Sequence, residues 1–154
     1  MNRYIIITIC FTVLSLYNYA QLPHTSFSQL DSLQKKEPRN VVVFIHTDWC
    51  KYCLAMEETT FKNPAVVKIL SSKFYFVILN AEEKHDIFFN GHTFKFKPTG
   101  SGIGVHELAE QLGTGKGAAT YPALCFLNEK NEIIYQQADY ISVSDIKHIL
   151  DRVR

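Results

Sequence analysis

The sequence predicts a single α/β domain in which a central mixed β-sheet is flanked by helices. Two uninterrupted apolar runs, residues 41–45 and 74–79, have the β-branched and aromatic composition of buried strands. A helical pattern separates them, and two strands joined through a helix form a right-handed parallel βαβ unit. A hairpin pattern over residues 121–135 adds antiparallel strands. With 154 residues and 47% hydrophobic content, the chain can bury one core of ordinary size.

The first twenty residues have the layout of a cleaved signal peptide. Arg3 is their only charge, and residues 4–16 are nearly all apolar. This stretch is shorter than the roughly 20 residues that a helix needs to cross the hydrocarbon of a membrane. We therefore expect a signal peptide at 1–20, a mature domain at 21–154, a periplasmic or secreted location, and no stable membrane insertion after cleavage. Lipidation of Cys10 and a buried first strand or helix are the alternatives.

Helical and strand patterns alternate in the first half of the mature domain. Apolar residues at helical spacing predict a short amphipathic helix that ends at Pro38: Phe27, Leu30 and Leu33. The run 41–45 follows as a central strand. A second helical pattern starts near Lys51 and breaks at Pro64, and the run 74–79 is then another buried strand.

The second half begins with an insert. Phenylalanines alternate with polar residues and glycines, so we expect an inserted loop or hairpin around 84–104, which either binds a partner or packs on the domain. A short helix is predicted over 106–112, with one apolar face: Val105, Leu108, Ala109 and Leu112. The glycines of 113–117 follow this helix instead of leading from a strand into one, which argues against a phosphate-binding loop. A strand after Pro122, a return strand and an amphipathic helix over 142–154 complete the pattern.

The charge balance excludes some classes of partner. The 16 lysines and arginines nearly match the 15 aspartates and glutamates, which leaves a net charge of +1. Such a surface has no long-range field that would attract nucleic acid or an anionic membrane. We therefore expect no nucleic acid among the partners.

Cys50 and Cys53 lie where a buried strand passes into a helix. Free backbone N–H groups and the positive end of the helix dipole lower the pKa of a thiol there from about 8.5 toward roughly 3.5–7.5, so Cys50 is the expected nucleophile. Cys53 follows one helical turn later and is the expected resolving thiol. An inert disulfide and a zinc site with His46 are alternatives, although zinc usually needs a second close pair of ligands. We expect no metal.

The segment Trp49-Cys50-Lys51-Tyr52-Cys53, followed by Met56-Glu57 and later by Tyr121-Pro122, resembles the thioredoxin superfamily. More narrowly, it is similar to exported bacterial thioredoxin-like proteins that carry a Trp-Cys-x-x-Cys motif. The resemblance covers residues 27–83 and 105–154. It implies a thioredoxin-like fold for residues 21–154, and a redox-active disulfide, Cys50–Cys53, as the only cofactor.

The resemblance also implies roles for residues around the cysteines. Pro122 is expected to be a cis-proline that faces the cysteines, with an ordinary trans-proline as the alternative. Tyr121 is expected to offer its backbone to an extended substrate chain. The expected substrate-binding residues are Trp49, Lys51, Tyr52, Tyr121 and Pro122. Cys125, in the apolar strand after Pro122, is interpreted as a small buried hydrophobic residue.

Two departures from the family pattern affect the chemistry. Thioredoxins commonly have a buried acid six residues before the first cysteine, and this chain has Phe44 there. The proton of the resolving thiol must therefore be handled by another group: His46, Asp48 or water. Lys51 adds positive charge beside Cys50, at an exposed-site magnitude of roughly 0.3–1 kcal/mol, which weakly favours a more oxidising couple.

The predicted function is thiol–disulfide exchange with client proteins outside the cytoplasm. A reductase is favoured, kept reduced by an electron-transfer partner in the membrane, because an oxidising compartment supplies disulfides but no electrons. The sequence leaves the direction of electron flow open. The alternative is a non-catalytic thioredoxin-fold module that binds polypeptides in a groove near Trp49 and Pro122.

Overall fold

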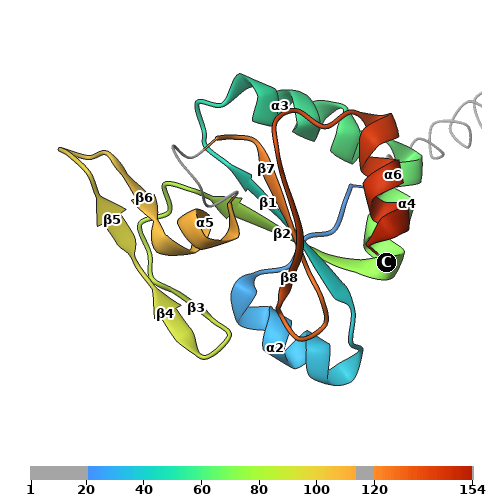
Figure 1. The fold of residues 1–154 in the computed structure, drawn as a ribbon, viewed down its shortest axis with the longest axis horizontal. Helices are drawn as coiled ribbons and strands as arrows, with labels where there is room; N and C mark the ends of the chain where they lie inside the picture. The colour runs from blue at the N-terminus through green and yellow to red at the C-terminus, as the bar shows by residue number, and fades with distance from the viewer. Residues whose placement is uncertain (1–20, 114–119, 154) are drawn as a thin grey trace, which may run out of the picture.

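The computed structural model describes residues 21–113 and 120–153, so the predicted leader and most of the glycine segment 113–117 lie outside the described residues. The main sheet has four strands in the order β2-β1-β7-β8 (Figure 1). The strands are β1 (Asn40–His46), β2 (Phe74–Asn80), β7 (Ala123–Leu127) and β8 (Ile133–Ala138). β1 pairs in parallel with β2 and antiparallel with β7, and β7 pairs antiparallel with β8, so the sheet is mixed, as predicted.

Three helical pieces carry the chain from β1 to β2: α3 (Lys51–Glu58), the 3-10 helix η2 (Thr60–Lys62) and α4 (Pro64–Lys73). Asn63 caps α4, because its side-chain oxygen accepts hydrogen bonds from the backbone N–H groups of Ala65 and Val66 (3.1 and 3.3 Å). Pro64 occupies the first turn, where its missing N–H would have no partner within the helix. The predicted break at Pro64 is therefore the start of a new, capped helix.

Helices cover both faces of the sheet. Figure 1 shows α3, α4 and α6 (Val143–Arg152) on one side and α2 (Phe27–Lys36) and α5 (Glu107–Leu112) on the other. Each set of helices encloses a separate apolar core with the sheet. Ser142 caps α6 through a hydrogen bond from the backbone N–H of Asp145 (3.3 Å).

The position of β1 inside the sheet explains why its sequence is apolar without interruption. Alternate residues of a strand face opposite sides of the sheet. Val42 and Phe44 belong to the core under α3, α4 and α6, whereas Val41, Val43 and Ile45 belong to the core under α2 and α5. All five side chains are fully buried. The prediction of a central strand is confirmed.

β2 is the edge strand of the sheet, and it is largely buried, as predicted: Phe74 and Phe76 belong to one core, and Val77 and Leu79 to the other. Ile78 is 39% exposed, and Tyr75 is half-buried. Beyond β2, Thr25 forms a single parallel bridge to Val77, and its N–H donates to the carbonyl of Phe76 (2.8 Å). An apolar run has the same appearance at the edge and at the centre of a sheet, so periodicity alone could not distinguish the two positions.

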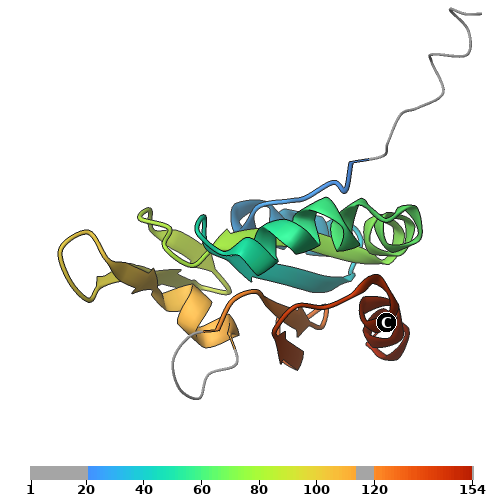
Figure 2. The same ribbon diagram turned by 90° about the horizontal axis from the view of Figure 1, so that it is seen from above.

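The predicted insert forms two antiparallel hairpins, which extend from one side of the domain (Figure 2). Their strands are β3 (Ile87–Phe89), β4 (His92–Phe94), β5 (Phe96–Pro98) and β6 (Gly104–His106). Asn90 and Gly91 make the β3–β4 turn with φ angles of 50° and 77°, a region that asparagine and glycine tolerate best. Phe89 packs edge-on against Phe27 of α2 (5.0 Å between ring centroids), so the insert shares the core of the domain.

His106 joins the insert to α5. The residue is fully buried, and its Nδ1 accepts a hydrogen bond from the backbone N–H of Leu108 (3.2 Å). Its Nε2 lies 3.2 Å from the carbonyl oxygen of His85, so the ring carries its proton on Nε2. The helix predicted over 106–112 is α5, although Val105 lies in β6 instead of on the apolar face of the helix.

A side chain at position 104 is expected to destabilise the insert. A Cβ on Gly104 would collide with the carbonyl oxygen of Lys97, the ring of Phe96 and the Cα of Pro98. Gly104→Ala should therefore lower the free energy of unfolding by about 1–3 kcal/mol, as other overpacked sites do. Gly100→Ala is the matched control, because nothing lies within 4 Å of its Cβ. Urea unfolding, with amide exchange in β5 and β6 as the local readout, compares the two variants. Equal stability would contradict the expectation.

Candidate active site

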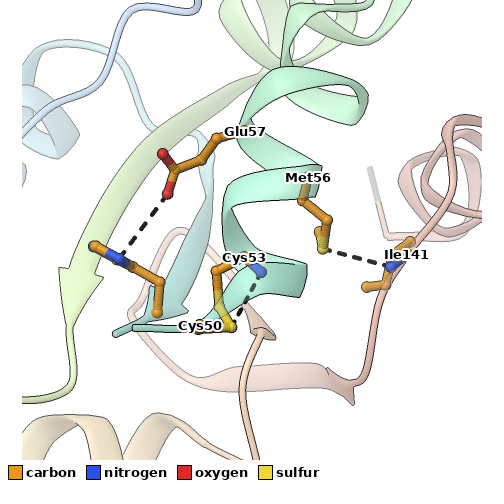
Figure 3. Close-up of a disulfide and its surroundings, with 6 residues drawn as sticks. Cys50, Cys53, Met56, Glu57 and Ile141 are labelled. Atoms are coloured by element: carbon orange, nitrogen blue, oxygen red, sulfur yellow. Dashed lines mark hydrogen bonds and ion pairs between the residues drawn. A yellow bond between two sulfur atoms is a disulfide. The ribbon is translucent and has the colours of Figure 1, made fainter. Parts of the chain in front are cut away.

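Cys50 and Cys53 form a disulfide at the N-terminus of α3 (Figure 3). The S–S distance is 2.09 Å, and the Cα atoms are 5.2 Å apart. Cys50 is the N-cap, and its Sγ accepts a hydrogen bond from the backbone N–H of Cys53 (3.1 Å). The N–H of Cys50 donates to the carbonyl oxygen of Thr47 (3.1 Å). The first sulfur therefore lies at the positive end of the helix dipole, where a thiolate is stabilised.

The two sulfurs differ in their access to solvent. Cys50 retains 7% of its accessible surface and Cys53 retains 1%. Cys50 is thus largely buried, but it is the more accessible of the two. Cys53 belongs to the same core as Met56, whose sulfur accepts a hydrogen bond from the backbone N–H of Ile141 (3.5 Å, Figure 3). This contact ties α3 to the segment before α6.

Three exposed side chains form an apolar rim beside the disulfide. Trp49, Tyr52 and Leu54 are 67%, 67% and 59% exposed. Leu54 was not among the predicted site residues. The signal for it is its place directly after Cys53, because successive helical residues project about 100° apart and a neighbour of a buried residue faces outward. Lys51 is also exposed at the start of α3.

Trp49 is held from two sides. Its indole N–H donates to a carboxylate oxygen of Glu82 (3.2 Å) in the segment after β2. Its ring meets the ring of Tyr121 in a T-shaped contact, with 6.4 Å between centroids. Glu82 was not a predicted site residue either, because no local pattern links it to a residue on another loop. The contact with Tyr121 places the residue before Pro122 next to the residue before Cys50.

The Tyr121–Pro122 bond is cis, as the resemblance implied. Pro122 is buried, and its carbonyl oxygen accepts a hydrogen bond from the N–H of Asp139 (3.1 Å). The Tyr121 hydroxyl is buried and has no hydrogen-bond partner among the described residues. Burial raises the pKa of this hydroxyl above its usual value. The substrate-binding roles of Trp49, Lys51, Tyr52, Tyr121 and Pro122 stay predictions.

A histidine at the end of β1 lies close to a glutamate in the last turn of α3. The ring of His46 stacks on Phe44, with centroids 5.6 Å apart and planes 7° from parallel. His46 Nδ1 is 4.0 Å from a carboxylate oxygen of Glu57. Asp48, the other predicted proton-handling side chain, accepts a hydrogen bond from the amide of Asn80 (3.0 Å) at the surface.

Cys125 lies apart from the pair. It is fully buried in β7, in the core shared with α2 and α5, whereas Cys50 and Cys53 belong to the opposite core. Burial raises the pKa of the Cys125 thiol to about 12. A thiol with this pKa is almost entirely protonated at neutral pH and is a poor nucleophile.

Within residues 21–113 and 120–153, no three His, Cys, Asp or Glu side chains are placed to hold a metal ion together. None of the helices in the same ranges is long and apolar enough to cross a membrane.

Comparison with known proteins agrees with this geometry. A family model described as a thioredoxin-like domain matches residues 27–154. Comparison with curated protein sequences gives no match. Among solved structures, a thioredoxin from Thermus thermophilus is 18% identical, with a TM-score of 0.60, covering 86% of this chain and 87% of its own. A DsbH oxidoreductase is 14% identical (TM-score 0.57, 88% of both chains). The reduced C-terminal domain of DsbD from Neisseria meningitidis is 15% identical (TM-score 0.53, 82% of this chain and 92% of its own).

Cys125 is expected to resist alkylation in the folded protein. After reduction, iodoacetamide at neutral pH should modify Cys50 within the time in which the peptide of Cys125 stays unlabelled, because Cys125 is buried and has a raised pKa. Denaturation should abolish the difference, since it exposes every thiol. Peptide mass spectrometry measures both rates, and labelling of Cys125 at the rate of Cys50 in the native state would contradict the assigned burial.

Proposed function

Since the chain belongs to the thioredoxin-like domain family, we propose that it is a thiol–disulfide oxidoreductase that reduces protein disulfides outside the cytoplasm. One observation carries the proposal: a disulfide whose first sulfur caps a helix lies beside an exposed apolar rim. A sulfur in this position is a good nucleophile once it is reduced. The rim offers contact area to a polypeptide.

The reaction needs the two thiols in sequence. The Cys50 thiolate attacks one sulfur of a client disulfide, a Cys50–client disulfide forms, and the second client sulfur leaves as a thiolate that takes a proton from water. Cys53 loses its proton and attacks Cys50 Sγ. The Cys50–Cys53 bond forms and the first client sulfur leaves, also to be protonated. The client gains two electrons and two protons, and the protein loses the same.

Client binding involves the apolar rim and the loop before β7. Trp49, Lys51 and Tyr52 surround Cys50 on the surface, and Trp49 contacts Tyr121. We assign these residues, with Pro122, to the binding of an extended client segment, in which the backbone at Tyr121 pairs with the client in the manner of an added strand. Amphipathic aromatic side chains suit this task because they offer large contact area with few rotatable bonds.

Location and electron supply follow from the leader pattern. Residues 1–20 have the composition of an export signal, and an exported reductase must obtain its electrons from a partner in the membrane. The structural similarity to the DsbH oxidoreductase supports the class of reaction. The proposed clients are exported proteins with disulfides.

Reduction of insulin tests the activity. Cys50→Ser should abolish turnover, because no nucleophile remains. Cys53→Ser should accumulate Cys50–client mixed disulfides, because the resolving thiol is missing. Cys125→Ala is the control and should keep turnover, since Cys125 lies in the opposite core. Negligible turnover in the wild type, with undiminished client binding in the Cys50→Ser, Cys53→Ser double variant, would favour the polypeptide-binding module.

The redox potential tests the direction of electron flow. The protein has one tryptophan, and it directly precedes Cys50, so Trp49 fluorescence should report the state of the disulfide during equilibration with glutathione. A reductase is expected to have a potential near that of thioredoxin, about −270 mV, and a value near −120 mV would identify an oxidant instead. Replacing Glu82 with Gln, which changes a contact of Trp49, controls for fluorescence changes that are unrelated to the sulfurs.

A further inference from the structure

We infer that His46 accepts the proton of the Cys53 thiol when Cys53 attacks the mixed disulfide, and that Glu57 positions His46 and passes the proton to solvent. This inference rests on the proposed function, because it assigns the base for the second step of that reaction. Cys53 is 1% exposed, and bulk water therefore has little access to its thiol. A buried thiol stays protonated unless a base takes its proton, since burial disfavours the charged form.

The carboxylates of Asp48 and Glu82, near the junction of β1 and α3, have different partners. The Asp48 carboxylate is exposed and accepts the Asn80 amide. The Glu82 carboxylate accepts the Trp49 indole N–H. Phe44, which stands where thioredoxins commonly have an acid, has no group that accepts a proton. These contacts leave His46 as the base on the α3 side of the strand.

The fold places His46 on the face of β1 that α3 covers, beside Glu57, a residue one helical turn beyond Cys53. His46 stacks on Phe44, two residues earlier on β1, so both rings face α3 and the core that contains Cys53. Its Nδ1 lies 4.0 Å from Glu57, and Glu57 follows Cys53 by four residues. Residues four apart are neighbours on one face of a helix. Figure 3 shows Glu57 one turn beyond Cys53, on the side of α3 away from Met56.

The neighbouring side chains do not compete for the contact between His46 and Glu57. Glu57 and Glu58 are the carboxylates of α3, and Glu58 forms an ion pair with Lys62 on η2. β2 places the neutral Asn80 opposite His46 in the sheet register. Glu57 therefore has the role of holding the imidazole, and its negative charge stabilises the imidazolium while the proton resides there.

Exposure rises along the path from the thiol to solvent. Cys53 is 1% exposed, whereas the side chains of His46 and Glu57 are 18% and 40% exposed. Glu57 also lines a cavity of about 500 Å³ whose floor is aromatic, formed by Phe44, Phe61 and Phe76. Because the Glu57 side chain is 40% exposed, water reaches its carboxylate directly.

The step balances without a further reactant. The proton passes from Cys53 Sγ to an imidazole nitrogen of His46, and the Cys53 thiolate attacks Cys50 Sγ. The Cys53–Cys50 bond forms while the Cys50–client bond breaks, and the electron pair of that bond leaves with the client sulfur. The client thiolate then takes up a proton from solvent, and His46 returns its proton through Glu57.

A two-step thiol reagent separates resolution from the first attack. When the reduced full-length protein reacts with excess dithiobis(nitrobenzoate), attack by Cys50 releases one thionitrobenzoate at a rate proportional to reagent concentration. Resolution by Cys53 then releases a second at a rate independent of concentration. Near neutral pH, His46→Gln should slow the second release on the order of 10²-fold and leave the first release nearly unchanged. The loss should shrink as pH rises, because hydroxide then replaces the missing base.

Matched variants decide the assignment. Glu57→Gln should slow the second release by a smaller factor and change its pH profile, whereas Glu58→Gln, on the adjacent position of the same helix, should change neither. An unchanged second release in His46→Gln, an equal slowing of both releases, or the same loss in Asp48→Asn would overturn the inference. If His46→Gln does not fold, Glu57→Gln at the helix surface still tests the relay. Absence of the first release in the wild type would instead refute the proposed function.

Discussion

The hydrogen bond from the Cys53 N–H to Cys50 Sγ is the contact on which the site depends. It exists because β1 ends at His46 and α3 begins at Lys51, so a turn of four residues places a sulfur where the helix has unpaired N–H groups. β1 itself is fixed by pairing on both sides, in parallel with β2 and antiparallel with β7. The position of the sulfur is thus set by the most rigid part of the domain.

The same strand separates two chemical environments for cysteine. Cys50 lies at the end of β1, where a helix dipole and solvent are both available, whereas Cys125 pairs with Val43 in the middle of the sheet. Its environment raises the pKa of the Cys125 thiol to about 12 through burial alone. Cys50 and Cys125 have the same side chain, so the difference in their reactivity as nucleophiles comes from where each thiol lies: one at a strand end, the other in the middle of the sheet.

Much of the fold and the sulfur pair could be predicted from sequence because the signals are local. A run of β-branched residues identified β1, Pro64 marked a break between two helical pieces, and the spacing of the cysteines identified the site. The edge position of β2 and the bond between Trp49 and Glu82 could not be predicted. Each depends on which element packs against which, and sequence periodicity carries no information about that. The contact of His46 with Glu57 could not be predicted either. It depends on which face of β1 His46 occupies and on how α3 is rotated above that face.

The insert differs from the site in how it is held. Its buried contacts with the domain lie at its base, where Phe89 packs on Phe27 and the buried ring of His106 bonds to the backbone on both sides. Exposed ion pairs from Lys97 to Glu107 and Glu110 add to these contacts. Residues 97–103 at the end of the second hairpin are exposed throughout. The tip can therefore change in length or composition without loss of the attachment, as exposed loop ends generally tolerate insertion. This hairpin is accordingly a suitable place for an epitope, an affinity handle or a spectroscopic label.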